Sequence, residues 1–487
     1  MNRPITTYFA PLAWVSGAWS KDVLLCVAAD GTWQSIHPDA TPEQQQGAIR
    51  LTGPVLPGLV NAHSHAFQRA IAGMTERTSG AVGNQDNFWS WRDRMYRVAQ
   101  RITPDQLESI AALLYAELLQ AGYTQVCEFH YLHNGLAGRQ YANPLEMSLA
   151  LVRAAQRVGI GITLLPTLYM RSGFSATGLR DDQMRFASTP ESIFKLCESI
   201  RKHPDQRLVS TGLALHSLRA VGHSALLEAA AYAKSQQMPI HIHVAEQTAE
   251  VADCMAVHGQ RPVEWLLNHA ALNPSWNLVH ATHSTPTELE GVKSSGASIV
   301  LCPTTEAKLG DGVFNLPSYA AVPGNWSIGS DSHVTRSWQE ELRLLEYSQR
   351  LTLRLRNVMA GTGTAIFTGS GTASGTGSGT GADAESESSS AAALFNAAVA
   401  GGTAASGQRL GGLSVGNRAD FLVVDSTASA LLGVPSRYLL DAMVFSSPDA
   451  RPSDVWVAGR LVVRSGEVEN RQVLAEDFST TMLALWD

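Results

Sequence analysis

The chain has 487 residues and a formal net charge of −7, with 45% hydrophobic and 16% charged residues. This composition is typical of a globular protein and excludes a disordered one. The chain contains no run of about 18 uninterrupted apolar residues, so no transmembrane helix is expected. The acidic balance argues against nucleic acid or an anionic membrane as a partner. No signal peptide is apparent, and five scattered cysteines without a CxxC pair fit a reducing compartment, so we expect a cytoplasmic protein.

Both ends of the chain carry short, strand-like apolar segments. Gly and Asp interrupt them near the N-terminus, and Gly459 marks a turn near the C-terminus. We therefore predict a small β-sandwich domain formed by both termini, residues 1–54 and 410–487. The segments that predict its strands are 7–15, 22–30, 420–425 and 454–464.

The middle of the chain alternates apolar runs with helical patterns, such as those at 104–122, 144–159 and 223–237. This alternation predicts right-handed βαβ units and a parallel sheet. Eight runs are the number of strands in a (β/α)8 TIM-type barrel, although an open doubly wound sheet would show a similar pattern. The runs are 55–63, 124–130, 162–168, 208–216, 239–246, 276–283, 297–303 and 326–333.

Polar side chains at the ends of these runs favour the barrel, because a barrel brings all carboxyl ends of its strands to one face. They are His63, His65, His130, His216, His243, Glu246, His280, His283 and Asp331. We predict an α/β fold with the barrel over 55–360 and its last helical part over 391–409. Between them, residues 361–390 are rich in Gly, Ser and Thr, which predicts a disordered insertion without a catalytic role.

Several of these side chains could bind one metal ion. His63 and His65 are two residues apart on a predicted strand, so their side chains share a face. An HxH motif alone is a weak signal, and strand-end histidines are often only hydrogen-bonded. With His243 and Asp331 added, however, four nitrogen and oxygen donors favour zinc or iron(II) over magnesium or calcium.

Two further side chains, Glu246 and His280, are not needed as ligands. They could move protons between a metal-activated water molecule and a substrate. The candidate catalytic residues are therefore Glu246, His280 and Asp331.

Four motifs together resemble the amidohydrolase superfamily: PGLVNAHSH, HIHVAEQ, LVHATH and GSDSH. The resemblance covers nearly the whole chain outside the insertion, including RLGGLSVGNRADFLVVD near the C-terminus. The HxH, HxxE, His and Asp pattern without a carboxylated lysine is similar to the mononuclear deaminase branch. This resemblance implies one divalent ion, with Zn²⁺ preferred and Fe²⁺ as the alternative.

Within that branch, the strings NAHSHAFQRAIAGMTE, NFWSWRDRMYRVA, EFHYLHN and ALHSLRAV resemble the formimidoylglutamate deiminases. That family hydrolyses N-formimino-L-glutamate to N-formyl-L-glutamate and ammonia in histidine degradation. The resemblance implies His63, His65, His243 and Asp331 as metal ligands, and Glu246 and His280 as proton-transfer residues. The implied substrate contacts are Gln68, Arg92, Tyr131, His216 and Arg219, with Arg94 as the alternative to Arg92.

The implied partner is a small dicarboxylate, and a homodimer is possible. Arginine suits a dicarboxylate because its guanidinium binds carboxylates through two hydrogen bonds. Two other functions stay open. One is a deaminase of a nucleobase or triazine-like ring, and the other is a non-catalytic barrel scaffold, which would be expected to lack some of these residues.

Overall fold

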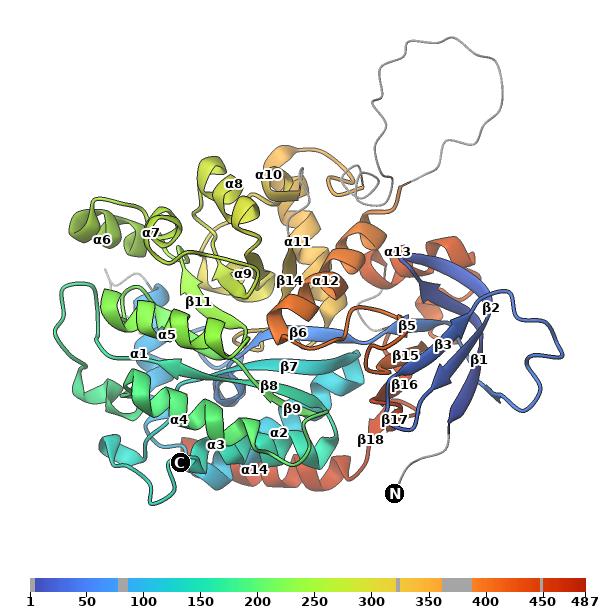
Figure 1. Cartoon of the computed structure of the whole chain (residues 1–487), viewed down its shortest axis with the longest axis horizontal. Coiled ribbons are helices and arrows are strands. Elements are labelled where there is room, and N and C mark those ends of the chain that lie inside the picture. Colours follow the sequence, from blue (N-terminus) through green and yellow to red (C-terminus); the bar gives the residue numbers. More distant parts are fainter. Residues whose placement is uncertain (1–4, 78–85, 321–324, 361–387, 447–449) are drawn as a thin grey trace, which may run out of the picture.

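The computed structural model of the protein describes residues 5–77, 86–320, 325–360, 388–446 and 450–487. Two sheets form its framework (Figure 1). One is built from both ends of the chain, and the other is the barrel of the middle region. Residues 361–387 of the predicted insertion lie outside the described residues, so that prediction stays a prediction.

The terminal sheet has nine strands in the order β18-β17-β16-β15-β5-β1-β2-β3, with β4 paired to β1. Its core includes Phe421 and Trp456, whose rings stack 4.5 Å apart, with the Tyr8 ring edge-on to both. The two termini therefore form one β domain, as predicted. Its strands are β1 Thr6–Val15, β2 Ala18–Val27, β3 Trp33–His37, β4 Ile49–Arg50, β5 Val55–Pro57, β15 Phe421–Val424, β16 Pro452–Val457, β17 Arg460–Arg464 and β18 Glu467–Val468.

The second sheet has the order β14-β13-β12-β11-β10-β8-β7-β6, with β9 paired to β8, and its strands are parallel. A parallel bridge between Ser64 and Asp331 brings its two ends together. Because β9 and β10 pair with successive parts of β8, they count as one divided strand, and the eight-stranded barrel is confirmed. The strands are β6 Leu59–Ser64, β7 Tyr123–His130, β8 Gly161–Leu168, β9 Val209–Thr211, β10 Leu213–Ser217, β11 Ile240–Val244, β12 Trp276–His280, β13 Ser298–Leu301 and β14 Trp326–Ile328.

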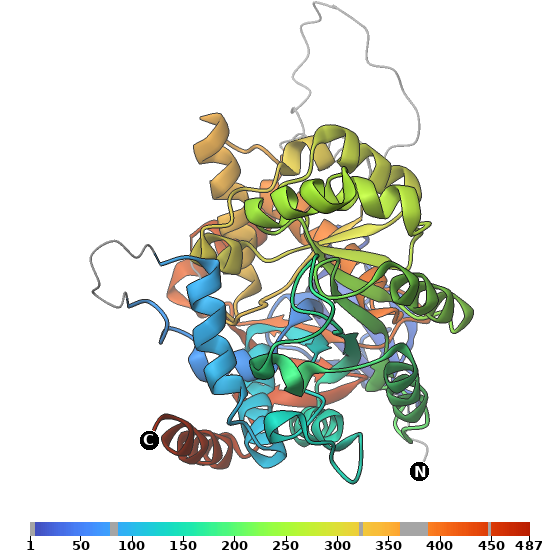
Figure 2. The same cartoon turned by 90° about the vertical axis from the view of Figure 1, so that its left-hand side faces the viewer.

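Helices surround the barrel (Figure 2). Several begin where a threonine side chain accepts a backbone N–H and a proline follows, as at Thr103, Thr189 and Thr285. The helices are α1 Phe88–Ala99, α2 Pro104–Ala121, α3 Glu146–Val158, α4 Pro190–Arg201, α5 His223–Ser235, α6 Thr248–His258, α7 Pro262–His269, α8 Pro286–Ser295, α9 Pro303–Leu309, α10 Leu316–Ala320, α11 Trp338–Leu353, α12 Ser390–Ser406, α13 Leu439–Phe445 and α14 Arg471–Trp486.

Two predicted strands are each divided in the structure at a glycine. Gly58 separates β5, which belongs to the terminal sheet, from β6, which belongs to the barrel. A Cβ atom on Gly58 would lie 2.5 Å from the Thr124 side chain, and one on Gly212, between β9 and β10, would lie 2.7 Å from the Pro239 carbonyl oxygen. The breaks therefore occur where neighbouring strands approach too closely for a side chain.

The amino ends of the barrel strands face the terminal sheet, and their carboxyl ends open on the opposite side, which Figure 2 turns toward the viewer. The buried Arg418 closes the amino end. Its guanidinium donates to the carbonyl oxygens of Thr124 and Arg207 and forms an ion pair with Asp420 at 2.6 Å. This contact joins the terminal sheet to the barrel and leaves the carboxyl face for a functional site.

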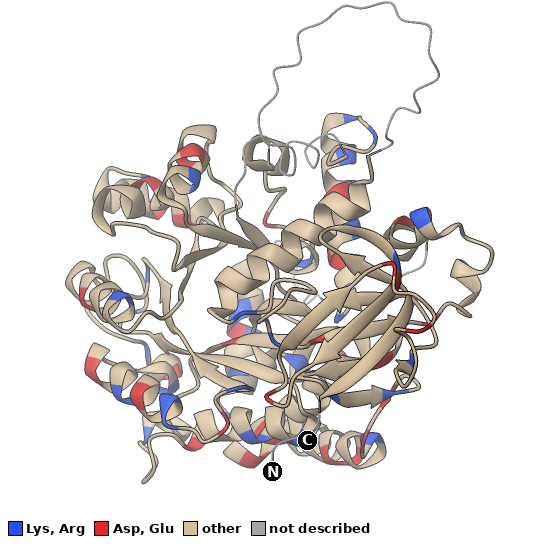
Figure 3. Ribbon diagram, turned by 45° about the vertical axis from the view of Figure 1, so that its right-hand side comes forward, with Lys and Arg blue, Asp and Glu red and all other residues tan. Residues whose placement is uncertain are grey.

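Basic and acidic residues are interspersed along the helices visible in Figure 3. No helix within the described ranges is long and apolar enough to cross a membrane.

Candidate active site

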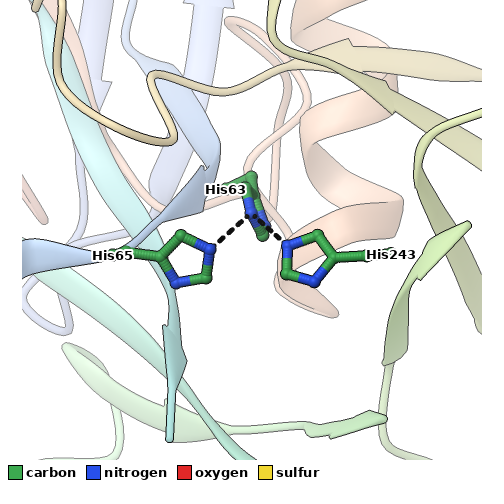
Figure 4. A group of neighbouring side chains, drawn as sticks. All are labelled: His63, His65 and His243. Carbon is green, nitrogen blue, oxygen red and sulfur yellow. Dashed lines mark hydrogen bonds between the residues drawn. The ribbon is translucent and has the colours of Figure 1, made fainter. Parts of the chain in front are cut away.

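Three imidazoles meet at the carboxyl face of the barrel (Figure 4). His63 lies on β6, His65 directly follows that strand, and His243 lies on β11. The Nε2 atom of His63 lies 3.1 Å from Nε2 of His65 and 3.0 Å from Nε2 of His243. All three side chains are buried.

Hydrogen bonds on the far side of the His65 and His243 rings determine whether their Nε2 atoms carry a proton or a lone pair. Nδ1 of His65 lies 2.9 Å from the Phe129 carbonyl oxygen, and Nδ1 of His243 lies 3.0 Å from that of His216. Because a carbonyl oxygen can only accept, both Nδ1 atoms donate, and both Nε2 atoms carry lone pairs. Burial lowers the pKa of His63 to about 3 and also lowers the pKa of His65 and His243, so all three rings are neutral near pH 7.

A proton on Nε2 of His63 could be donated to Nε2 of His65 or to Nε2 of His243, but not to both. The other pair would bring lone pair against lone pair, which is unfavourable unless a cation lies between them. The donor set therefore fits a metal ion.

Asp331 completes the cluster just after β14. One of its oxygens lies 3.5 Å from Nε2 of His63 and 3.4 Å from Nε2 of His65. Burial would raise the pKa of this carboxyl, but the neighbouring imidazoles hold it below its usual value. The backbone of Asp331 has a φ of 45°, a left-handed conformation uncommon for a residue other than glycine.

Glu246 and His280 lie beside this cluster. Nε2 of His280 is 3.7 Å from a Glu246 oxygen and 3.8 Å from an Asp331 oxygen, and its Nδ1 is 3.3 Å from Glu306. Burial raises the pKa of Glu246, whereas the surrounding carboxylates raise the pKa of His280 against the opposing effect of burial. The pair can therefore share a proton near neutral pH.

A buried acid supports the HxH segment from behind. Glu128, on β7, accepts hydrogen bonds from the Ser64 hydroxyl and the Ala66 backbone N–H, both at 2.6 Å, and from the Tyr115 hydroxyl at 3.1 Å. Ser64 and Ala66 flank His65 in the chain. Glu128 therefore fixes the direction in which β6 presents its imidazoles.

A cavity opens onto the cluster and is lined by the five predicted substrate contacts. His65, His243, Glu246, His280 and Asp331 also line it. Arg94 does not line it, because its guanidinium pairs with Asp86 and donates to the Thr75 carbonyl oxygen. The predicted contacts that face the cavity are Gln68, Arg92, Tyr131, His216 and Arg219.

Arg92 and Arg219, two of the arginines that line the cavity, both contact the ring of Trp89, which belongs to α1. The Arg92 guanidinium carbon is 4.5 Å from its ring and that of Arg219 is 5.6 Å away. In the described structure, the Nε atoms of both arginines are buried without a hydrogen-bond partner. Arg219 has only long contacts, 3.9 Å, to Glu246 and Glu250. Both guanidinium groups thus have donors left for an anion.

His130 and His283, two of the strand-end histidines singled out in the sequence, belong neither to the His cluster nor to the cavity lining. The His130 ring packs against His133, and the His283 backbone N–H bonds to Ala245. His241, on the same strand as His243, bonds to the Ala405 carbonyl oxygen in the core. The positions of these rings explain why a strand-end histidine alone does not identify a site.

Sequence reasoning did not single out Trp89, Glu128, Glu306 or Arg171. Trp89 lies in a stretch that contributes only to the family resemblance, and the sequence carries no signal of what α1 contacts. The two glutamates lie on or directly after predicted strands, where the strand-end rule could have found them.

Comparison with known proteins places the chain in a family. The sequence profile of the Amidohydrolase family matches residues 55–462. The chain belongs to the amidohydrolase family. This amidohydrolase is 42% identical over 484 residues to formimidoylglutamate deiminase of Pseudomonas aeruginosa, covering 99% of this chain and 100% of the relative. The resemblance seen in its motifs is thereby confirmed.

Solved structures agree with this assignment. An amidohydrolase from Brucella melitensis superposes on the protein with a TM-score of 0.87 and 38% identity, covering 99% of this chain and 100% of that one. An adenosine deaminase from Xanthomonas campestris with bound zinc shares the fold, with a TM-score of 0.76 and 22% identity over 99% and 98% of the two chains. The family is typically metal-dependent, and the His cluster of this amidohydrolase is its candidate site.

Proposed function

We propose that this amidohydrolase hydrolyses the formimino C–N bond of N-formimino-L-glutamate, giving N-formyl-L-glutamate and ammonia in histidine degradation. The observation that carries the proposal is the pair of arginines, Arg92 and Arg219, in the cavity that holds the His and Asp cluster. Two guanidinium groups with free donors match a substrate with two carboxylates. The relative from Pseudomonas aeruginosa, 42% identical over nearly the whole chain, supports the same substrate.

A single Zn²⁺, with Fe²⁺ as the alternative, would be held by His63, His65, His243 and Asp331. The support is the convergence of lone pairs on neutral imidazoles beside an ionised carboxylate. When bound, such an ion supplies a water molecule activated for attack on the formimino carbon.

Glu246 and His280 handle the protons of this reaction. His280, held by Glu306 on its far side, accepts the proton that the attacking water loses when the proton shared by the pair lies on Glu246. Glu246, whose pKa burial raises, is protonated often enough near neutral pH to protonate the departing nitrogen. The C–N bond then breaks and ammonia leaves. The water oxygen becomes the new formyl oxygen as its second proton passes to the Glu246 carboxylate that the preceding transfer left behind.

The remaining cavity residues orient the glutamate part of the substrate. The Gln68 amide and the Tyr131 hydroxyl lie 3.4 Å apart and act as a pair of donors. His216 lines the cavity beside Tyr131, with ring centroids 5.5 Å apart. Together with the arginines they hold the formimino end toward the cluster.

Steady-state release of ammonia by the purified, metal-analysed protein tests the substrate. The panel is N-formimino-L-glutamate, N-formiminoglycine, guanine and adenosine. We expect kcat/KM for N-formimino-L-glutamate to exceed that for N-formiminoglycine by about a hundredfold, because the latter lacks the second carboxylate. Faster turnover of guanine or adenosine would instead establish the ring-deaminase alternative, and absence of all turnover with metal bound would favour a scaffold.

We also infer that the protein acts in the cytoplasm as a homodimer. Light scattering during size-exclusion chromatography checks the dimer, for which a mass of about one chain would be the contradicting result.

A further inference from the structure

We propose that Arg171 is a positioning residue that fixes Arg219 for substrate binding. This inference rests on the proposed function, since it concerns how the same cavity recognises a carboxylate. Arg171 lies in the segment that follows β8, and Arg219 lies in the segment that follows the neighbouring strand β10. Both line the cavity.

The guanidinium of Arg171 is directed at the backbone of the segment that carries Arg219. Its Nε donates to the Arg219 carbonyl oxygen at 3.1 Å, and its Nη2 donates to those of Leu218 and Val221 at 2.8 and 3.2 Å. Its Nη1 donates to the Phe174 carbonyl oxygen of its own loop at 3.2 Å. One side chain thus binds three carbonyl oxygens within four consecutive residues.

The backbone of the same segment adds to this clamp. The N–H groups of Met170 and Arg171 both donate to the Ala220 carbonyl oxygen, at 2.8 and 3.1 Å. Each carbonyl oxygen from Leu218 to Val221 is therefore bound from the β8 side. Residues 218–221 follow β10 but belong to no helix or strand. These bonds hold them together with a turn in which the N–H groups of Ala220 and Val221 donate to the Ser217 carbonyl oxygen at 3.1 Å.

The Arg219 side chain has no comparably tight contact. Its ion pairs with Glu246 and Glu250 are both 3.9 Å long, and its Nε has no hydrogen-bond partner in the described part of the chain. The position of its guanidinium therefore follows from the position of its backbone. A loss of the clamp should weaken recognition of the carboxylate, because misplacement by about 1 Å is costly at a binding site.

The charge of Arg171 is not what the clamp requires. In the structure as described, Arg171 forms no ion pair with a carboxylate, so its hydrogen bonds all go to backbone oxygens. Lysine keeps the charge but has one nitrogen and cannot reproduce the planar fork. R171K therefore separates the clamp from the charge.

The test compares R171K, R171M and R219M with the double variant R171K/R219M by steady-state kinetics on N-formimino-L-glutamate. We expect R171K to raise KM by about tenfold with kcat changed less than about threefold. In the R219M background, R171K should change KM by less than about twofold, because the residue it positions is gone.

R418K is the matched control. Arg418 is also buried and also donates to backbone carbonyl oxygens, but at the opposite end of the barrel. R418K should lower the melting temperature and leave KM unchanged. Calorimetric binding of glutarate, a dicarboxylate, and butyrate, a monocarboxylate, to the same variants provides a readout independent of turnover.

The outcomes separate the two proposals. If R171K turns over the substrate like the wild type with an unchanged KM, Arg171 has no positioning role, and the proposed function stands. The same holds if R171K has an equally large effect with and without Arg219. An effect seen in R171M but not R171K assigns the role to charge and also overturns the clamp. If the substrate is not turned over but R171K weakens glutarate binding only when Arg219 is present, the clamp holds and the function fails. If the wild-type protein neither turns over the substrate nor binds glutarate, both proposals are overturned.

Discussion

Glu246 and His280 form a buried acidic and basic pair, 3.7 Å apart, at the wall of the cavity. Burial of such a pair costs desolvation energy that an apolar pair would not, so its presence indicates use in chemistry. These two side chains are therefore the first ones to test for a role in proton transfer.

E246Q tests the first of them. The amide has nearly the shape of the carboxylic acid but cannot transfer the proton, so we expect kcat to fall by about a thousandfold. Metal content should stay at the wild-type level, because Glu246 is not in the proposed ligand set. D253N, at an exposed acid on α6, is the control and should leave kcat unchanged. A kcat for E246Q within a few-fold of wild type would remove Glu246 from proton transfer.

R219M tests the proposed carboxylate contact directly. A hydrogen bond to a charged group contributes about 1.5–3 kcal/mol, so KM should rise by about 10- to 100-fold. N-Formiminoglycine should be affected less than N-formimino-L-glutamate if Arg219 binds the side-chain carboxylate. Equal losses for both substrates would assign Arg219 to the α-carboxylate, and unchanged KM values would remove it from binding.

At the scale of elements, the cluster depends on how closely β6 and β14 approach each other. Asn61 on β6 exchanges two hydrogen bonds with Ser330, at 2.7 and 2.9 Å, and the Asp331 backbone N–H donates to the His63 carbonyl oxygen at 3.0 Å. Gly329 makes this approach possible, because a Cβ atom there would lie 2.6 Å from Cβ of His63.

G329A should therefore push His63 out of the cluster. We expect a loss of bound metal and of activity, with a destabilisation of about 1–3 kcal/mol from overpacking. Metal analysis and denaturant unfolding measure the two effects. G291A on α8 is the control, since its added methyl group meets only the end of the Leu267 side chain, and bound metal should be unchanged. Full metal content in G329A would show that β6 can yield without disturbing His63.

Local rules in the sequence predicted the architecture and the polar strand-end residues of the cavity. The other predicted lining residues followed from the family resemblance, and half of the cavity lining was not predicted. Alternating apolar and helical segments predicted a parallel sheet, and the polar side chains at the strand ends favoured the barrel. The two-residue spacing of His63 and His65 predicted that both rings share one face. The placement of Arg92 rather than Arg94 in the cavity needed the structure, since both lie on α1 and only their partners differ.

Other features depend on contacts between distant segments and have no local signal. The need for glycine at positions 58 and 212 arises from Thr124 on β7 and from Pro239 just before β11. Arg171 is recognisable only once its loop lies against the segment of Arg219.

At the scale of the whole molecule, one metal site would join strands from both halves of the barrel, β6 and β14 with β11. Removal of the metal should therefore destabilise the whole fold. Dialysis against a strong chelator should lower the melting temperature by about 5 °C or more and abolish activity, and added Zn²⁺ should restore both. Verified metal removal without either change would contradict the proposed centre.

The ion pair between Arg418 and Asp420 should stabilise both sheets together. D420A leaves a buried guanidinium unpaired, which costs about 3–5 kcal/mol in the free energy of unfolding. D477A breaks an exposed ion pair with Arg157 and should cost less than about 1 kcal/mol. Chemical denaturation compares them, and equal effects would show that Arg418 finds other partners.

Gly58 alone separates β5, the last strand that the N-terminal segment contributes to the terminal sheet, from β6, which bears His63 and leads directly into His65. A catalytic fragment that begins at the barrel would lack β5, which ties β6 to the terminal sheet. Chimaeric genes made from this chain and a relative should therefore avoid crossover points near residue 58, and should inherit the N-terminal segment, β6 and the C-terminal strands from one parent.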